Sequence, residues 1–330
     1  MPAARSPRKA RPPTLTVVAP VFNERESLPE LYRRVRAVME GLGEPWELIL
    51  VDDGCSDGSD QAMDDLARRD RRVRAIHFAR NFGHQIAVTA GLDQARGQAV
   101  VIIDADLQDP PEVIPDLVAQ WRNGFEVAYG VRTEREGETW FKTMTASLFY
   151  RVIYRITDVR IPLDTGDFRL LDRRVVEALS HMRERHRFLR GMAAWVGFRQ
   201  TGVPYKRAAR QAGVTKYPFR KMVRLALNAV TSFSYFPLQI ATYLGFACAA
   251  ASAVAILVVI ALRLSGNQAF FGQATTLSAV LFLGGIQLIS LGLIGEYLGR
   301  IYDEVKGRPL YVLRSDPPQS EPRRGAKTKR

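Results

Sequence analysis

Two aspartates and a glutamine stand at every second position directly after an apolar run of the chain. The run covers residues 99–103, and Asp104, Asp106 and Gln108 follow it. If the run is a strand, this spacing puts the three side chains on the same side of the chain. Two carboxylates and a carbonyl oxygen suit a hard divalent ion, Mg²⁺ or Mn²⁺, that keeps open positions for substrate phosphates. The alternative is that these residues only form a turn after the strand, but we predict that they hold a metal ion.

Polar residues follow two other apolar runs in the same way. They are Asn23 and Glu24 after the first run, and Asp52 and Asp53 after the second. Several acids at one edge of a sheet repel one another unless a cation or hydrogen-bond donors compensate. Neither a Gly-x-Gly-x-x-Gly sequence nor a Walker phosphate loop occurs. Dinucleotide-binding and phosphate-loop sites therefore lack their defining element here.

Alternating strands and helices are the elements that must bring these acids together. Apolar runs alternate with stretches of helical periodicity in the first part of the chain. Strands that are apolar throughout and alternate with helices predict an α/β fold with a mainly parallel sheet covered by flanking helices. Ligands of such sheets bind at the carboxyl ends of the strands, where the acids stand. We expect strands at 14–22, 46–51, 73–78, 99–103 and 127–130, and helices at 28–42, 61–69 and 85–95.

Two long stretches in the last third of the chain contain no charged residue. They cover residues 238–262 and 264–295. Because about 20 helical residues with a rise of about 1.5 Å each cross a bilayer core of about 30 Å, each stretch predicts one transmembrane helix. The two cysteines, Cys55 and Cys248, are too few for a disulfide framework. The sequence thus predicts a large α/β head followed by a C-terminal two-helix transmembrane hairpin.

Positive charge lies on both sides of the predicted hairpin, in a chain of net charge +13. Residues 199–224 contain eight basic residues and no acidic one, a basic tail follows residue 300, and 265–274 is uncharged. The positive-inside rule therefore places the head and both termini in the cytosol and the connecting loop outside. Nucleic-acid binding is the alternative explanation of a basic chain, but no binding motif occurs, and we expect no nucleic-acid partner.

These patterns divide the chain into five parts. The N-terminal residues are basic and lack a cleavage region of a signal peptide, so we expect a disordered tail. A segment with alternating aromatic, basic and apolar residues precedes the hairpin and fits an amphipathic helix lying on anionic lipids. The expected parts are the disordered basic tail 1–13, the catalytic domain 14–216, the amphipathic interfacial segment 217–236, the two transmembrane helices 237–300 and the cytosolic C-terminal tail 301–330.

Five short motifs of the head resemble those of the inverting glycosyltransferases of family 2. The similarity extends over about residues 15–313 and is specifically to the polyprenyl-phosphate glycosyltransferases, a group that includes dolichyl-phosphate mannose synthases. The two apolar stretches followed by Glu296-Tyr-Leu-Gly-Arg300 resemble the bacterial branch, which contains undecaprenyl-phosphate glucosyltransferases. The five motifs are Pro20-Val-Phe-Asn-Glu24, Val51-Asp-Asp-Gly-x-Ser56-x-Gly58, Arg80-Asn-Phe-Gly83, Asp104-Ala-Asp-Leu-Gln-Asp-Pro-Pro111 and Gly166-Asp-Phe-Arg-Leu170.

The resemblance implies a GT-A-type fold and an inverting transfer of one sugar from a nucleotide-sugar to a polyprenyl phosphate. The protein would be a metal-dependent hexosyltransferase at the cytosolic face of the bacterial plasma membrane, with the lipid bilayer as a partner and a multi-pass anchor. UDP-glucose is our first choice of donor, and GDP-mannose, UDP-N-acetylhexosamine and UDP-aminoarabinose are the alternatives. We also expect the chain to form a homo-oligomer.

The resemblance also implies roles for individual residues. Arg210 and Lys216 match a loop that closes over the donor diphosphate. Arg132, Arg135 and Ser147 match residues near the acceptor phosphate. The nucleotide-sugar site implied by the resemblance comprises Pro20, Asn23, Glu24, Asp52, Asp53, Asp104, Arg210 and Lys216.

The chemistry of the implied reaction assigns the remaining roles. A lipid phosphate is already anionic near neutral pH, so it needs little help to attack a sugar carbon. The harder task is to stabilise the departing nucleoside diphosphate. Arg210 would do this directly, and Asp106 would do it by holding the metal ion. Asp167 would orient the acceptor or remove a residual proton, and its alternative role is a turn acid that holds Arg169. Among the histidines, His84 alone is a candidate for the donor site.

Two other functions fit part of this pattern. A processive polysaccharide synthase shares the Asp-x-Asp head, but the chain lacks a Gln-x-x-Arg-Trp sequence, and two spans are too few for a polymer channel. A non-catalytic membrane scaffold that binds nucleotide-sugars would not need Arg210 or the three predicted metal ligands Asp104, Asp106 and Gln108, which we call the metal row. Both are present. We therefore predict an enzyme that transfers a single sugar.

Overall fold

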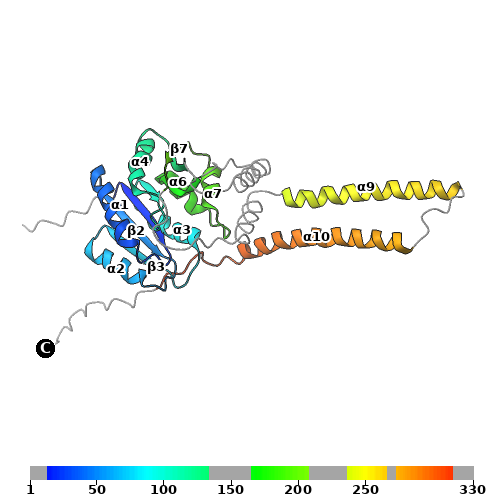
Figure 1. The fold of residues 1–330 in the computed structure, drawn as a ribbon, viewed down its shortest axis with the longest axis horizontal. Coiled ribbons are helices and arrows are strands. Elements are labelled where there is room, and N and C mark those ends of the chain that lie inside the picture. Colours follow the sequence, from blue (N-terminus) through cyan, green and yellow to red (C-terminus); the bar gives the residue numbers. More distant parts are fainter. Residues whose placement is uncertain (1–12, 134–164, 208–235, 266–272, 315–330) are drawn as a thin grey trace, which may run out of the picture. The chain divides into compact units, whose positions relative to one another are not determined.

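The computed structural model describes residues 13–133, 165–207, 236–265 and 273–314. These residues form two compact units, which we describe separately (Figure 1). The first unit is built around a β-sheet and comprises the first two ranges together with 309–314, and the second consists of two helices. Most of the predicted basic tail and of the predicted amphipathic segment lies outside the described residues.

A seven-stranded sheet forms the centre of the first unit, with the strand order β3-β2-β1-β4-β6-β5-β7. Neighbouring strands are parallel except at β6, which is antiparallel to both β4 and β5. The predicted mainly parallel sheet is therefore confirmed, and all five predicted strands are present. The strands are β1 (Leu15–Val21), β2 (Trp46–Asp52), β3 (Val73–His77), β4 (Ala99–Ile102), β5 (Val127–Arg132), β6 (Thr165–Asp172) and β7 (Gln200–Tyr205).

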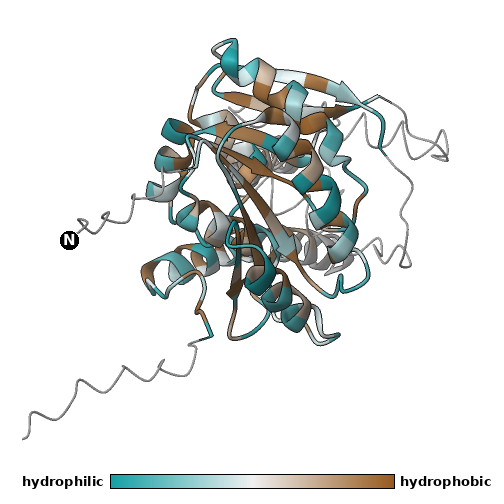
Figure 2. Ribbon diagram, turned by 90° about the vertical axis from the view of Figure 1, so that its left-hand side faces the viewer, coloured by the Kyte–Doolittle hydropathy of each residue, from teal (hydrophilic) through white to brown (hydrophobic). Residues whose placement is uncertain are grey.

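Helices cover both faces of this sheet. Leu31 and Met63 pack in one core cluster with Val17 of β1, whereas Gly91 lies against Val18, the next residue of the strand. Because successive strand residues point to opposite faces, α1 and α2 cover one face and α3 covers the other. Apolar residues are accordingly concentrated in the strands (Figure 2). The helices are α1 (Leu28–Leu42), α2 (Ser59–Arg69), α3 (His84–Gln94), α4 (Ile114–Arg122), α6 (Arg173–His181) and α7 (Leu189–Trp195), with a 3₁₀ turn η1 (Pro111–Val113).

The three predicted helices of the head are present, and α1 shows why they form. Leu28, Leu31, Val35 and Met39 recur at helical spacing, and all four are fully buried. Gly43 ends the helix in a left-handed conformation with φ 68, and its N–H donates to a carbonyl of the last turn. The apolar stripe of this helix therefore fixes it on the sheet.

The helix α3 lies very close to the sheet and carries two side chains of the candidate site. A Cβ atom at Gly91 would overlap Cγ1 of Val18 in β1, so only a glycine allows this approach. The helix begins at His84, directly after the loop that follows β3. The close packing thus holds His84 and Gln85 at the carboxyl edge of the sheet.

Two long helices form the second unit. α9 (Phe236–Leu264) and α10 (Gln273–Val305) run side by side in opposite directions (Figure 1). Large apolar side chains on both are exposed, such as Phe246 (71%) and Leu288 (72%), which is typical of a surface that contacts lipid or another protein. Among the described residues, Phe282–Val305 is long and apolar enough to cross a membrane, judged by length and composition, and Ala241–Ala255 is a shorter apolar segment. The predicted pair of C-terminal helices is therefore present.

The chain that follows α10 packs at the end of β3 as part of the first unit. Within residues 309–314, Leu313 forms an antiparallel bridge with Phe78. The Tyr311 ring stacks on the Phe78 ring with centroids 5.3 Å apart, and its hydroxyl donates to Asp93 over 3.0 Å. This piece of the predicted C-terminal tail pairs with the chain at the carboxyl end of β3, a strand at one edge of the sheet.

Candidate active site

The polar residues predicted from the sequence meet at one edge of the sheet. Asn23 follows β1, Asp52 ends β2 and Asp53 follows it. Asp104 follows β4, and Asp167 lies near the start of the antiparallel strand β6. The carboxyl ends of the parallel strands and the start of β6 are on the same side, so the structure brings these residues to the edge where α/β sheets bind ligands.

The loop after β1 is tied to the loop after β2. Asn23 has a left-handed backbone with φ 57, which asparagine tolerates better than most residues. Its Oδ1 accepts the Ser56 N–H over 2.8 Å. Glu24 accepts the Ser27 hydroxyl at Oε2 over 3.2 Å, and Pro20 is buried within β1. Three residues of the predicted nucleotide site thus lie in or beside one connected pair of loops.

The two aspartates at the end of β2 are almost fully buried and bond to protein groups. Asp52 accepts the Cys55 N–H over 2.7 Å and His77 Nδ1 over 3.0 Å. Burial acts to raise the pKa of Asp52, but these hydrogen bonds outweigh it and lower the pKa below its ordinary value. Asp53 accepts the N–H groups of Phe82 and Gly83 over 2.7 and 3.0 Å. Both carboxylates therefore shape the loops, and their contact with a nucleotide stays a prediction.

The predicted metal row occupies a tight turn. β4 ends at Ile102, yet burial still alternates along the row, because Leu107 is buried while Asp104, Asp106 and Gln108 are half-buried. The Gln108 N–H donates to Asp106 Oδ1 over 3.1 Å. Leu107 has a left-handed backbone with φ 60, which is unfavourable for leucine and is held by burial of its side chain, 2% exposed. The row is thus a strained turn instead of a continued strand, and the same-side arrangement of its three side chains stays a prediction.

His84, Asp104 and Asp167 form the centre of the site. His84 Nε2 lies 3.2 Å from Asp167 Oδ2 and 3.6 Å from Asp104 Oδ1. Asp167 is 8% exposed and also accepts Arg190 Nε over 2.7 Å and Gln85 Nε2 over 3.0 Å. Three separate elements, α3, α7 and β6, are therefore joined through one carboxylate.

The alternative interpretation of Asp167, a turn acid that holds Arg169, predicts a contact between these two residues, but Asp167 contacts a different arginine. Asp167 pairs with Arg190 of α7. Arg169 of β6 is buried, and its Nη2 donates to the Gly166 carbonyl over 3.0 Å. Burial lowers the pKa of Arg169 to about 10. The local pairing of Asp167 with Arg169 is thus replaced by a contact with a distant helix.

The central groups have strongly shifted pKa values. Burial acts to lower the pKa of His84, but its hydrogen bond to Asp167 and the charge of Asp104 raise it to about 9. Burial acts to raise the pKa of Asp167, yet Arg190 and His84 hold it well below its usual range. Burial and neighbouring carboxylates raise the pKa of Asp104 to about 6 against the effect of His84. At neutral pH His84 is therefore a cation and Asp167 an anion.

The residues of the metal row fit a divalent ion. Asp104 Oδ1 is buried and has no hydrogen-bond partner within the described residues, which is costly for an acceptor. An ion at this oxygen would satisfy it and offset the charge of the neighbouring carboxylates. In the described part of the chain, no three His, Cys, Asp or Glu side chains are placed to hold a metal by themselves. The ion would therefore draw further ligands from Gln108 and from substrate oxygens.

A second charged group lies on the other side of β4. Arg132 ends β5, and its Nε donates to the Tyr205 hydroxyl over 3.4 Å. The Tyr205 hydroxyl donates to the buried carboxylate of Asp109. Arg207 Nε lies 3.6 Å from the same carboxylate. Of the residues predicted to bind the acceptor phosphate, Arg132 is thus found at the same edge as the metal row.

Several predicted residues lie outside the described part of the chain, and several observed ones were not predicted. Sequence reasoning missed Gln85, Arg190, Tyr205 and Arg207, because nothing in their local spacing connects them to the acidic motifs. The residues outside the described ranges are Arg135, Ser147, Arg210 and Lys216.

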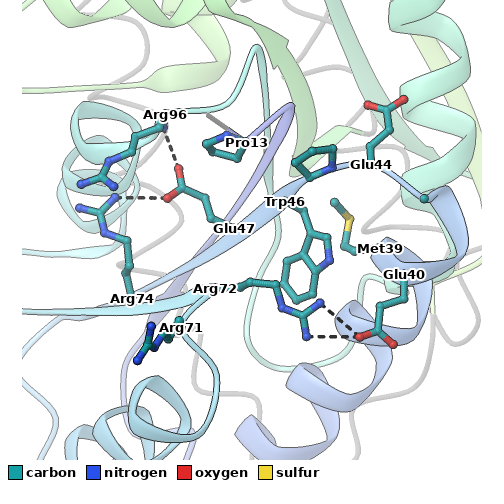
Figure 3. A pocket seen from close by; sticks show the side chains of 12 residues that line it. Pro13, Met39, Glu40, Glu44, Trp46, Glu47, Arg71, Arg72, Arg74 and Arg96 are labelled. Atoms are coloured by element: carbon teal, nitrogen blue, oxygen red, sulfur yellow. Dashed lines mark hydrogen bonds and ion pairs between the residues drawn. The ribbon is translucent and has the colours of Figure 1, made fainter. Parts of the chain in front are cut away.

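A hollow at the opposite end of the sheet is distinct from this site. It has a volume of about 710 Å³ and lies where β2 begins, beside Trp46 and Glu47 (Figure 3). Its charges are largely paired within the protein, since Glu47 Oε2 lies 3.4 Å from Arg74, and Glu40 lies 3.2 Å from Arg72. None of the predicted site residues that the structure describes lines it.

Comparison with known proteins matches both parts of the chain. Residues 16–180 match glycosyl transferase family 2, and residues 236–301 match the GtrB C-terminal hairpin. An uncharacterised glycosyltransferase of Bacillus subtilis (strain 168) is 47% identical over 298 residues, which cover 90% of this chain and 92% of that protein. The bactoprenol glucosyl transferase of Shigella phage SfII is 41% identical over 301 residues, 91% of this chain and 97% of that protein.

Solved structures resemble the chain at low sequence identity. The glucosyl-3-phosphoglycerate synthase from Mycobacterium tuberculosis, in complex with Mn²⁺, UDP-glucose and phosphoglyceric acid, has a TM-score of 0.45 and 16% identity. This comparison covers 66% of this chain and 78% of that chain. A mannosyltransferase from Pyrobaculum calidifontis, in complex with GDP-Man and Mn²⁺, has a TM-score of 0.43 and 18% identity, covering 87% of this chain and 91% of that chain.

Proposed function

Because this chain belongs to glycosyl transferase family 2, we propose that it transfers a glucosyl group from UDP-glucose to a polyprenyl phosphate. A bactoprenol glucosyl transferase that is 41% identical over nearly the whole chain supports this choice. The structural observation that carries the proposal is the meeting of two groups at one sheet edge, the acidic cluster around Asp104 and the arginine group around Arg132. The first suits a metal-bound diphosphate, and the second suits an acceptor phosphate.

Asp104, Asp106 and Gln108 would hold a divalent ion, Mg²⁺ or Mn²⁺. The unsatisfied Asp104 Oδ1 and the raised pKa of the same carboxyl support this assignment. When bound, such an ion neutralises the donor diphosphate and the charge that develops as it leaves. Because Mg²⁺ usually takes one or two carboxylates together with substrate phosphates, the protein need not supply a full set of ligands.

The acceptor phosphate is the nucleophile of the proposed reaction. One of its oxygens forms a bond to the anomeric carbon while the bond from that carbon to the donor diphosphate breaks on the opposite face, which inverts the configuration. The phosphate is anionic at neutral pH and needs no strong base. Asp167 is a weak base because its pKa is so low, so its proposed role is to orient His84, Gln85 and Arg190. Protonated His84 places a positive charge beside Asp104.

The remaining roles follow the resemblance and stay proposals. Asn23, Glu24, Asp52 and Asp53 would contact the nucleotide, with Pro20 of β1 lining the same pocket, and the two aspartates would also hold their loops in place. Arg210 and Lys216 would close over the donor diphosphate, and Arg135 and Ser147 would assist Arg132 at the acceptor.

The proposed location is the cytosolic face of the bacterial plasma membrane. We propose that both α9 and α10 cross the bilayer and that both termini are cytosolic, in accord with the charge asymmetry of the sequence and the exposed apolar side chains. In a variant without native cysteines, a cysteine at Gly266 should react with an impermeant reagent added to intact cells, and one at Ser320 should not. The reverse labelling would contradict this topology. A homo-oligomer remains a prediction.

Lipid analysis tests the proposed reaction. The full chain in detergent is incubated with undecaprenyl phosphate, Mg²⁺ or Mn²⁺, and each of four labelled donors in turn: UDP-glucose, GDP-mannose, UDP-N-acetylglucosamine and UDP-aminoarabinose. We expect one hexose per lipid, from UDP-glucose. A lipid product from another donor would change the sugar, a polymer would indicate a processive synthase, and nucleotide-sugar binding without any product would indicate a scaffold.

A further inference from the structure

Asp109 is a buried carboxylate that the proposed reaction does not use. It is 0% exposed and follows the metal row directly. Oδ1 accepts the Tyr205 hydroxyl, while Oδ2 is buried without a hydrogen-bond partner in the described ranges. Two guanidinium groups approach the same Oδ1, with Arg207 Nε at 3.6 Å and Arg132 Nη2 at 4.0 Å. A buried carboxylate is therefore shared by two arginines.

Within the described residues, Asp109, Arg132 and Arg207 together carry an excess of one positive charge. One carboxylate faces two guanidinium groups, and arginine stays protonated in proteins. The side chains of Arg132 and Arg207 are 25% and 29% exposed, so each is open to a ligand on one side. Guanidinium groups bind phosphate oxygens through paired, charge-assisted hydrogen bonds. The group therefore fits an anion with phosphate chemistry.

The surroundings hold Arg132 in one position. Its Nε donates to the Tyr205 hydroxyl over 3.4 Å, and the two residues are register partners of strands β5 and β7. Its Nη2 lies against Gly166, because a Cβ added at Gly166 would be only 2.6 Å from this nitrogen. Tyr205 is 5% exposed and is itself held by Asp109. An arginine that is fixed before the ligand arrives loses less entropy on binding.

The order of the strands favours the acceptor phosphate over the donor diphosphate. β1 and β2, which lead into Asn23 and Asp53, lie on one side of β4. β5 and β7, which end at Arg132 and Tyr205, lie on the other side. Asp104 follows β4 between them. A nucleotide at the β1 and β2 loops with its diphosphate at Asp104 leaves the β5 and β7 side to the second substrate.

We propose that Arg207 and Arg132 together bind the phosphate group of the acceptor and that Asp109 is the positioning residue that holds both arginines. This inference rests on the proposed function, because it takes the acceptor to be a phosphate monoester. It adds Arg207 as a binding residue and assigns a positioning role to the buried carboxylate of Asp109.

Kinetics of Arg207 variants of the full chain in detergent test the binding role. The KM for polyprenyl phosphate is measured at saturating donor, and the KM for the donor at saturating lipid. Arg207→Gln should raise the lipid KM by about tenfold or more and change the donor KM less than about twofold, since one bidentate contact is lost. Arg207→Lys keeps the charge without the paired geometry and should be intermediate. The matched control is Arg33→Gln, an exposed arginine paired with Glu30 on α1, which should change neither KM.

Asp109→Asn tests the positioning role. The substitution preserves the shape and an acceptor for the Tyr205 hydroxyl but removes the charge that faces both arginines. It should raise the lipid KM selectively, and Tyr205→Phe should do the same more weakly. Calorimetric titration of each variant with decyl phosphate, without donor or metal, should show affinity lowered by a similar factor. A purely structural role would lower kcat and thermal stability without this selective change.

Two results would overturn the inference. One is an unchanged lipid KM in both Arg207 variants, and the other is an increase confined to the donor KM, which would assign Arg207 to the donor diphosphate. The proposed function fails separately, when the unaltered chain forms no sugar lipid from any donor. In that case the decyl phosphate titration of Arg207→Gln against the unaltered chain still decides whether the two arginines bind a phosphate monoester.

Discussion

His84 Nε2 lies 3.2 Å from Asp167 Oδ2, which joins the first turn of α3 to the start of β6. The same carboxylate accepts hydrogen bonds from Arg190 and Gln85, so its charge is compensated by two cations and an amide. A carboxylate in these surroundings stays ionised far below neutral pH. It is suited to hold other side chains in place and poorly suited to accept a proton.

This relationship predicts the behaviour of Asp167→Asn. Loss of the charge releases Arg190 and His84 from their positions, and we expect kcat to fall by roughly 10- to 100-fold. The carboxylate itself does not titrate between pH 5.5 and 8.5, but its loss lowers the raised pKa of His84, so the alkaline limb of the pH–rate profile should move to lower pH in the variant. The measurement is kcat/KM of both proteins over this range. Disappearance of an acidic limb in the variant would show instead that Asp167 is the general base.

Asp106→Asn tests the metal row. The substitution removes one negative charge from a site that must hold a divalent ion against a diphosphate, and the rate should fall on the order of 10² to 10³. Excess chelator should abolish activity of the unaltered chain, and Mg²⁺ or Mn²⁺ should restore it. Asp116→Asn, in the first turn of α4 and away from the row, serves as the control. Full activity in chelator would contradict a metal requirement.

The sequence predicted the parts of the fold that are encoded locally. β1 and β4 are almost entirely apolar and buried because both faces are covered, and α1 carries its apolar stripe at helical spacing, so each can be found in a short window of residues. The positions of the acids after the strands follow from the same pattern. The antiparallel insertion of β6 between β4 and β5 was not predicted, since strand order depends on contacts across the whole chain.

The sequence predicted the motifs of the site but not the contacts between their side chains. Asp104 and Asp167 were identified, but the contacts that set their chemistry join residues far apart in sequence, as in the pair Asp167 and Gln85. His77 is an intermediate case, because it is the register partner of Asp52 in neighbouring parallel strands. A prediction of strand pairing would have found this contact, whereas the contact between Asp109 and Arg207 needs the three-dimensional structure.

Gly91→Ala tests the close packing of α3. Because a Cβ at this position would overlap Val18, we expect the free energy of unfolding to fall by about 1 to 3 kcal/mol. Activity should fall as well, since α3 carries His84 and Gln85. Gly41→Ala in α1 is the matched control. A Cβ there meets nothing within 4 Å, and the higher helix propensity of alanine should stabilise the protein by about 0.5 to 1 kcal/mol. Denaturant unfolding followed by Trp fluorescence measures both, and equal stability of the two variants would contradict the packing argument.

His77 predicts a pH-dependent contribution to stability. Its ring nitrogens lie 3.0 Å from Asp52 and 3.1 Å from Asp64, and the hydrogen bond to Asp52 raises its pKa above 6.5 against the effect of burial. This stabilisation is fully present below pH 6.5 and is lost as the pH rises through the raised pKa. The Tm of the unaltered chain should therefore fall more between pH 6.5 and 9 than that of His77→Gln. Parallel Tm curves of the two proteins would show that His77 is neutral in the folded chain.

Tyr311→Ala tests the attachment of the segment 309–314 to the end of β3. The substitution removes the ring stacked on Phe78 and the hydroxyl bonded to Asp93, and should destabilise the segment by about 1 to 3 kcal/mol. Tyr311→Phe keeps the ring and should cost only about 1 kcal/mol.

Hydrogen exchange provides the direct measurement of this attachment. The amide of Ala79 donates to the Val312 carbonyl, and the amide of Arg314 donates to the His77 carbonyl. Both should exchange roughly 5- to 150-fold faster in Tyr311→Ala, the factor that corresponds to about 1 to 3 kcal/mol of lost local stability. Val312→Ala is the control, because its side chain is exposed and its carbonyl is retained. Unchanged protection of both amides in Tyr311→Ala would mean that the backbone pairing alone holds the segment on the sheet.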